Sequence, residues 1–207
     1  GGLEAYARHL GLALRTEYDV VEIARFQLRS VPALDFHEVD PGGFFKGAPL
    51  PVQIICPLPQ FRPLLRRLRH LITRPYPRRF AINIFEQAYR YPVDEALPDS
   101  VRHIHYIGTG WELLGFCAMK AARKRTIPFT IWPAVHPGTW GDNALDFMLY
   151  QGADAVFAPS DYERAHLIDG GRRSEAKHRG GLAPCTEAMG DGNRFRPGRG
   201  PGRRPEH

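Results

Sequence analysis

Residues 101–169 read VRHIHYIGTGWELLGFCAMKAARKRTIPFTIWPAVHPGTWGDNALDFMLYQGADAVFAPSDYERAHLID, and this stretch decides the fold. Short runs of β-branched and aromatic residues alternate in it with segments whose apolar residues recur at helical spacing. The predicted strands are 101–107, 128–132 and 155–158, and the predicted helices are 111–125, 143–151 and 161–168. Strands that alternate with helices through short turns are typical of a parallel sheet wrapped by helices.

We therefore predict an α/β fold, a Rossmann-like parallel sheet flanked by helices. Residues 1–171 form this domain, and residues 172–207 form a Gly/Arg/Pro-rich tail that we expect to be disordered. Ligands of such sheets gather at the carboxyl ends of the strands. The segments that would meet a ligand there are 1–2, 108–110, 133–142 and 159–160.

The first hundred residues carry weaker signals. Residues 79–89 are ambiguous, because FAINIF alternates like a strand while Glu86, Gln87 and Ala88 suit a helix. The other predicted segments are a helix over 1–16, strands over 19–26 and 52–56, a loop over 29–50 and a basic amphipathic helix over 61–73. The arginines of that last helix could meet phosphate groups, but they are more simply explained as a solvated face.

Composition narrows the function classes. The chain has 207 residues, of which 43% are hydrophobic and 24% charged, as in globular proteins. No apolar run approaches the roughly 20 residues of a membrane span, and we expect neither a signal peptide nor a transmembrane segment. Residues 172–207 hold nine Lys and Arg and four acids, so most of the net charge of +6 belongs to the tail. The remaining body is almost neutral, which argues against a nucleic-acid partner.

Cysteine usage points to a reducing, cytoplasmic setting. The three cysteines, Cys56, Cys117 and Cys185, are far apart and form no CxxC pair. His103 and His105 share one face of a predicted strand, but the spacing supplies no third ligand. We therefore expect no metal site.

Two glycine pairs are candidate anion or substrate sites. Gly1 and Gly2 open a helix, where backbone amides and the helix dipole favour phosphate. The alternative is a truncated terminus or a cloning remnant. Gly108, Thr109 and Gly110 lie between a strand and a helix, which suits a ligand-binding turn. The alternative is a plain tight turn, because the dinucleotide and P-loop fingerprints are both incomplete.

His136 lies in the loop PAVHPGTWGD, after a predicted strand, where a side chain can reach a ligand. A structural hydrogen bond is the alternative role for this histidine. Asp142 shares the loop and could instead cap the helix that follows. Ser160 and Glu163 form a capping box at the start of the last helix, which we expect to end at Gly170 or Gly171.

Four segments in this order resemble the N-terminal domain of GT-B glycosyltransferases of family 4. They are GGLE at the start, HIHYIGTGWELLGF, KRTIPFTIWPAVHPGTWGD and GADAVFAPSDYERAHL. The resemblance covers residues 1 to about 171 and rests on the ordered set rather than on one motif. It implies one half of a GT-B fold and a retaining transfer of a sugar from a nucleotide-sugar donor.

The resemblance also implies roles for particular residues. Gly1 and Gly2 match the glycine loop that approaches the donor diphosphate, and His136 matches a histidine near the transferred sugar. Ser160 and Glu163 match the start of the helix that leads toward the interdomain cleft. Residues 29–50 and the turn of Gly108, Thr109 and Gly110 become candidates for the acceptor. The nucleotide-sugar is a substrate, so no cofactor is expected, and the acceptor is a sugar-containing or lipid molecule, with peripheral membrane contact an option.

The chain departs from that family at both ends. The strand expected before Gly1 is absent, as is the second domain that supplies a basic residue and paired glutamates. Truncation or a frameshift explains the Gly/Arg/Pro-rich sequence after GDGNRFRPG, and we expect little activity from this chain alone. Two alternatives stay open: a non-catalytic sugar- or nucleotide-binding module, and another Rossmann-like enzyme such as a dehydrogenase.

Overall fold

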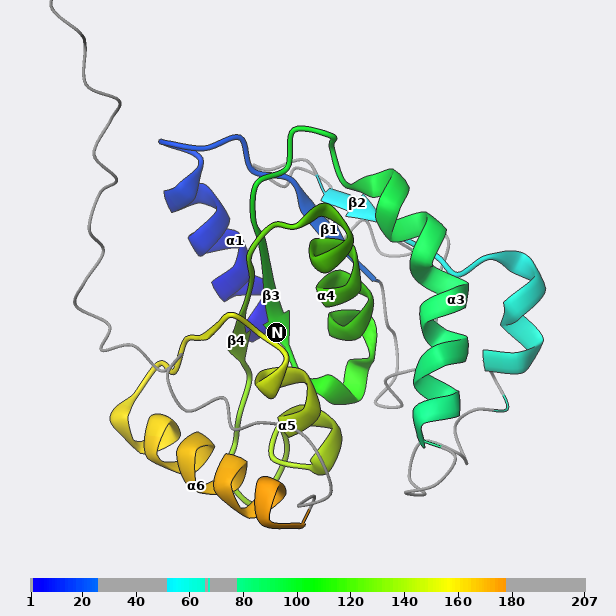
Figure 1. Cartoon of the computed structure of the whole chain (residues 1–207). Coiled ribbons are helices and arrows are strands. Elements are labelled where there is room, and N and C mark those ends of the chain that lie inside the picture. Colours follow the sequence, from blue (N-terminus) through cyan, green and yellow to red (C-terminus); the bar gives the residue numbers. More distant parts are fainter. Residues whose placement is uncertain (1, 26–51, 66, 68–77, 178–207) are drawn as a thin grey trace, which may run out of the picture.

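The computed structural model describes residues 2–25, 52–65, 67 and 78–177. The helices are α1 (Gly2–Leu14), α3 (Arg78–Ala96), α4 (Leu114–Arg125), α5 (Ala144–Gln151) and α6 (Asp161–Lys177). The strands are β1 (Glu22–Ala24), β2 (Val52–Ile54), β3 (Ile104–Gly108), β4 (Phe129–Pro133) and β5 (Ala155–Val156). Two short 3-10 turns, η1 (Pro59–Phe61) and η2 (Gly110–Glu112), complete the described elements (Figure 1).

All strand pairs are parallel, and helices flank them, so the α/β prediction is confirmed at this level. The described strands nevertheless form two sheets where one was predicted. One sheet has the order β1-β2, and the other has the order β3-β4-β5. In the larger sheet Ile104 lies opposite Phe129, and Thr130 lies opposite Ala155.

The two faces of the larger sheet are covered differently. Phe129 and Ile131 of β4 point into the core, where they are 2% and 0% exposed. Trp132, the next residue, points to the opposite face and stacks on Tyr6 of α1 with 3.5 Å between ring centroids. The sheet thus lies between α1 and α4, and its strands end toward α5 and α6 (Figure 1).

The ambiguous segment 79–89 is helical and belongs to α3. Its buried residues recur three or four positions apart, which decides for the helix over the local alternation of FAINIF. These residues are Ala81, Ile82, Phe85, Ala88, Tyr89, Val93 and Ala96. Pro92 lies inside the helix and cannot donate to the carbonyl of Ala88, which instead accepts the Leu58 amide at 2.9 Å. The Ala88 carbonyl, which Pro92 leaves without a helical donor, thus connects α3 to the segment after β2.

Several predicted boundaries were wrong. β1 and β2 span three residues each and are shorter than predicted. α4 begins at Leu114, because Leu113 adopts a left-handed conformation with φ of 61° and separates it from η2. The last helix continues through Gly170 and Gly171 to Lys177, so the domain boundary drawn at 171 falls inside α6. The predicted helix 61–73 is helical from 62 to 65, and most of it, like 29–50 and 178–207, lies outside the described residues.

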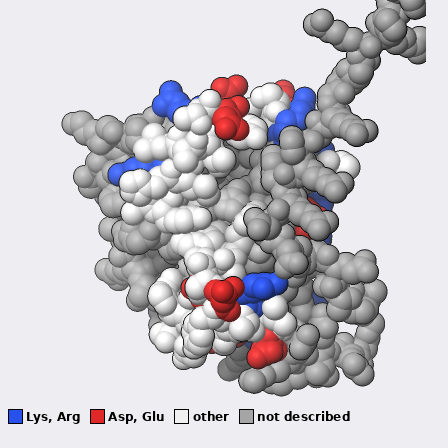
Figure 2. Space-filling model, turned by 90° about the vertical axis from the view of Figure 1, so that its left-hand side faces the viewer, with Lys and Arg blue, Asp and Glu red and all other residues white. Residues whose placement is uncertain are grey.

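The view in Figure 2 shows a face that is largely uncharged over its described part, with charged side chains gathered near its upper and lower ends. The described part of this face shows no broad basic patch, which agrees with the near-neutral composition of residues 1–171. Among the described helices, none combines the length and apolar character needed to cross a membrane.

Gly170 does not end α6; it allows the helix to pack closely against Phe147 of α5. A Cβ atom there would collide with the Phe147 ring of α5, whereas a Cβ atom at Gly171 would meet no atom within 4 Å. We therefore expect Gly170→Ala to lower the free energy of unfolding by about 1–3 kcal/mol through overpacking. The matched variant Gly171→Ala should raise it by about 0.5–1 kcal/mol through helix propensity. Urea denaturation measures both, and equal effects of the two variants would contradict this packing.

Candidate functional site

The loop that follows β4 is closed on itself by backbone hydrogen bonds. The His136 amide donates to the Trp140 carbonyl at 2.8 Å, and the Trp140 amide donates to the His136 carbonyl at 3.0 Å. Gly141 has a φ of 83°, and a Cβ atom there would collide with the Ala134 carbonyl oxygen. Only glycine therefore allows the chain to turn back toward α5 at this point.

One side chain within this loop and one from α5 hold it in place. The Asp142 carboxylate accepts the Gly138 amide at 2.6 Å, and the Tyr150 hydroxyl donates to the Gly141 carbonyl at 2.9 Å. Asp142 also lies 3.7 Å from the His166 ring, which links the loop to α6. The loop is thus held by α5 and α6 together.

His136 is exposed at the base of the turn 136–140, where it pairs with Trp140. Its ring lies 4.6 Å from the ring of Trp140, which is itself 38% exposed. An imidazole can donate and accept hydrogen bonds, and an indole offers a flat apolar surface beside it. The pair can therefore contact a ligand that has both polar groups and an apolar face.

Asp142 does not cap α5, so that alternative was wrong. Asn143 is the N-cap, and its side chain accepts the amides of Leu145 and Asp146 at 2.8 Å and 3.3 Å. The Asp146 carboxylate in return accepts the Asn143 amide at 3.0 Å. This reciprocal capping box was visible in the sequence as Asn143-Ala-Leu-Asp146, and the sequence analysis missed it.

The turn after β3 is buried. Thr109 is 4% exposed, and the Tyr106 hydroxyl donates to the Glu112 carboxylate at 2.8 Å across the turn. A side chain at Gly108, where φ is 147°, would collide with that carboxylate. The predicted cleft residues Gly108, Thr109 and Gly110 therefore enclose an internal contact.

Asp146 is the anion that this turn binds. Its carboxylate accepts the Trp111 amide at 3.0 Å and a hydrogen bond from the Gly110 amide. The side chain is fully buried, and this burial raises the pKa of Asp146 to about 6 although the backbone hydrogen bonds oppose the rise. The amides that could have faced a ligand phosphate are thus directed at the protein's own carboxylate.

The remaining predicted site residues lie elsewhere. Ser160 caps α6, since its hydroxyl accepts the Glu163 amide at 3.2 Å and contacts the Glu163 carboxylate at 2.9 Å. Gly2 is the first residue of α1, and Gly1 lies outside the described residues. No contact in the described part of the chain joins Gly2, Ser160 or Glu163 to His136.

His103, just before β3, and His105, within it, both contact one hydroxyl group. His103 Nε2 and His105 Nδ1 lie 2.7 Å and 2.8 Å from Thr130 Oγ1, which can donate to one ring and accept from the other. Burial lowers the pKa of His105 to about 4, with the neighbouring His103 adding to the effect. Within the described ranges no group of three or more potential ligands is placed to hold a metal ion.

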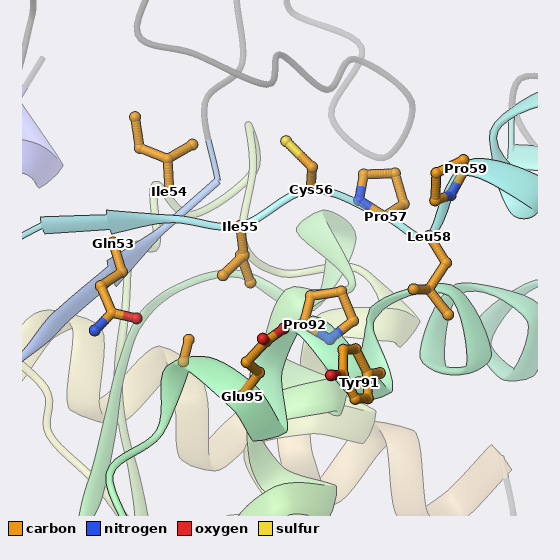
Figure 3. A pocket seen from close by; sticks show the side chains of 11 residues that line it. Gln53, Ile54, Ile55, Cys56, Pro57, Leu58, Pro59, Tyr91, Pro92 and Glu95 are labelled. Carbon is orange, nitrogen blue, oxygen red and sulfur yellow. The ribbon is translucent and has the colours of Figure 1, made fainter.

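A separate groove of about 350 Å³ lies between the segment after β2 and α3. Figure 3 shows the side chains of Gln53, Ile55 and Leu58 on the side of this segment that faces α3, which contributes Tyr91, Pro92 and Glu95 to the lining. The side chains of Ile54, Cys56 and Pro57 point the other way. The lining of the groove is mostly aliphatic and proline, and it contains none of the predicted site residues. We therefore place the candidate site at the His136 loop, where exposed polar and aromatic groups meet.

Comparison with protein-family models, with curated proteins and with solved structures finds no match for this chain. The function must therefore be argued from the residues themselves.

The Asp146 contact predicts a pH-dependent stability. Because the pKa of Asp146 is higher in the folded chain than in the unfolded one, the folded state holds the proton more tightly. Relative to Asp146→Asn, the wild-type chain should lose up to about 3 kcal/mol as pH rises from 4 to 6. Urea denaturation across this range measures the difference, with the exposed Asp99→Asn as control. If the difference in the free energy of unfolding between wild type and Asp146→Asn is the same at every pH, the prediction is wrong, and the backbone hydrogen bonds fully offset the effect of burial on the pKa of Asp146.

His105 predicts the opposite slope. Its pKa is lower in the folded chain, so the unfolded state takes up the proton first and stability falls as pH drops from about 6.5 to about 4. His105→Gln should remove this loss, whereas the exposed His9→Gln should keep it. The melting temperatures of wild type and of both variants are measured at pH 7.5 and at pH 4.5. The prediction is wrong if the difference in melting temperature between wild type and His105→Gln is the same at both pH values.

Proposed function

We propose that this chain is the acceptor-side, N-terminal half of a GT-B glycosyltransferase of family 4, which transfers a sugar from a nucleotide-sugar donor with retention. The observation that carries the proposal is the exposed His136 beside Trp140 on a braced loop at the carboxyl end of β4. This is the edge of a parallel α/β sheet at which ligands usually bind.

His136 would orient the transferred sugar. Its ring nitrogens can hydrogen-bond to sugar hydroxyls, and the Trp140 ring can pack on the apolar face of the pyranose. Because the loop is held by Asp142 and Tyr150, the imidazole is positioned before a ligand arrives, which lowers the ordering cost of binding.

The leaving nucleoside diphosphate would be stabilised by backbone amides at the start of α1, which begins at Gly2. The resemblance assigns Gly1 and Gly2 to this role. Ser160 and Glu163 would face the cleft from the start of α6. The acceptor would dock on this half, and the second half of the donor site would come from another domain. We assign no general base, because a retaining transfer of this kind does not require one.

The dehydrogenase alternative is less well supported. A dinucleotide needs free backbone amides at a glycine-rich turn to hold its pyrophosphate. At the turn after β3, the amides of Gly110 and Trp111 instead bind the Asp146 carboxylate. NAD should therefore leave the melting temperature unchanged, whereas a nucleotide-sugar should raise it.

The test separates the sugar from the nucleotide. UDP-, GDP- and ADP-glucose are titrated against Trp fluorescence, and the best donor is then compared with its free nucleoside diphosphate. We expect His136→Ala to weaken binding of the nucleotide-sugar about tenfold, equivalent to about 1.4 kcal/mol for one lost hydrogen bond. The affinity for the free nucleoside diphosphate should change little.

Two controls sharpen this result. His9→Ala removes an exposed histidine from α1 and should leave both affinities unchanged. Trp140→Phe should abolish most of the fluorescence response but keep part of the binding. The role assigned to His136 is wrong if His136→Ala lowers the affinities for the nucleotide-sugar and for the free nucleoside diphosphate equally. If the chain binds the sugar tightly but no transfer occurs when a second domain is supplied, the result favours the binding-module alternative.

A further inference from the structure

One carboxylate of α3 is left without a basic partner. Glu86 pairs with Lys120 at 2.6 Å, and Asp94 pairs with Lys124 at 2.8 Å. Glu95 is exposed, and within the described part of the chain no Lys, Arg or His forms an ion pair with it. It lies in the last turn of α3, which holds no basic residue, and the negative end of a helix disfavours an anion there. This position therefore favours an incoming cation.

An exposed aromatic ring lies next to this carboxylate. Tyr91 is 60% exposed and precedes Glu95 by four positions, so the two side chains are neighbours on the surface of α3 (Figure 3). A planar guanidinium can stack on an aromatic face and at the same time donate hydrogen bonds to a carboxylate. An ammonium group is a compact point charge and fits this pair less well. Tyr91 and Glu95 together therefore favour arginine over lysine.

The opposite wall of the groove offers apolar contacts. Gln53, Ile55 and Leu58 face α3 from β2 and the segment after it (Figure 3). The Leu58 amide donates to the Ala88 carbonyl at 2.9 Å, which holds this wall against α3. Because the two walls are already joined, a ligand does not have to order them, and this lowers the cost of binding. The volume of about 350 Å³ is close to the lower end for ligand sites, so the groove has room for a few side chains.

We propose that the groove between β2 and the end of α3 binds an extended, arginine-containing peptide segment of a partner protein. The arginine contacts Tyr91 and Glu95, and a proline or aliphatic residue beside it packs on Ile55 and Leu58. Extended proline-containing segments suit such grooves, because their backbone is already restricted before binding and their side chains pack on aromatic and apolar walls. Charge complementarity selects the partner, because the Glu95 carboxylate attracts a basic segment and repels an acidic one.

This inference goes beyond the proposed function and does not rest on sugar transfer. The groove lies beside β2 and the last turns of α3, whereas the loop of His136 is held by α5 and α6 (Figure 1). Peptide binding and nucleotide-sugar binding can therefore succeed or fail independently.

The test uses the full chain and a synthetic peptide as the probe. Fluorescein-labelled APPRPLP is titrated with the protein, and fluorescence anisotropy reports binding. Two matched peptides carry lysine or glutamine in place of the arginine. We expect the lysine peptide to bind about threefold more weakly and the glutamine peptide at least about tenfold more weakly. The affinity for APPRPLP should fall as salt is added, because the contact with Glu95 is exposed.

Substitutions in the groove test the contacts assigned to it. Glu95→Gln keeps the size of the side chain and removes its charge, and it should weaken binding of APPRPLP about tenfold. Tyr91→Leu should weaken binding about threefold through the lost stacking. Glu86→Gln is the matched control on the same helix: the Glu86 carboxylate already pairs with Lys120, so the peptide affinity should stay unchanged. The melting temperature of each variant reports whether it is folded.

A charge exchange separates direct contact from an indirect effect on the groove. Glu95→Lys should abolish binding of APPRPLP and gain binding of APPEPLP, in which glutamate replaces the arginine. Loss of the first peptide without gain of the second would overturn the assignment of Glu95.

Three further outcomes would overturn the proposal. One is that APPRPLP does not bind at about 1 mM protein. Another is that the glutamine peptide binds as tightly as the arginine peptide. The third is that APPRPLP binds only after alanine replaces the five arginines of residues 194–204, in which case the groove takes a segment of its own chain rather than of a partner. These arginines are Arg194, Arg196, Arg199, Arg203 and Arg204.

Discussion

The candidate site depends on one buried carboxylate. Asp146 binds amides from two directions, those of the turn after β3 and that of its own helix N-cap. A buried charge without such partners would cost several kcal/mol, so this geometry strongly restricts where α5 can begin. Since α5 carries Tyr150, which hydrogen-bonds to the loop of His136, the position of the exposed histidine depends on a buried contact.

The contact between Asp146 and the turn after β3 also requires a glycine at position 110. Gly110 lets η2 approach the backbone of α5 so closely that a Cβ atom would strike the Leu145 carbonyl. Without that approach the Trp111 amide could not reach Asp146. Close packing therefore explains both glycines that suggested a ligand-binding turn. Gly110 packs against the backbone of α5, and Gly108 lies against the side chains of Glu112 and Tyr106.

The sequence predicted the alternation of strands and helices over 101–169 because each element there has its own periodicity and is bounded by Gly or Pro. It could not decide residues 79–89, where alternation over six residues competes with a helical period that only shows over nineteen. It placed the end of the last helix at Gly170 or Gly171 because glycine usually stops helices, but the Phe147 ring occupies the space of a side chain at Gly170 and the helix continues to Lys177. The contact between Asp142 and His166 joins residues 24 positions apart and leaves no local pattern.

The candidate loop and the smaller sheet are separate parts of the fold. The hydrogen bonds and the ion pair described for the loop of His136 come from residues 134–166, which follow β3 and do not include β1 or β2. A substitution at His136 should therefore change ligand binding while it leaves the pairing of β1 with β2 intact.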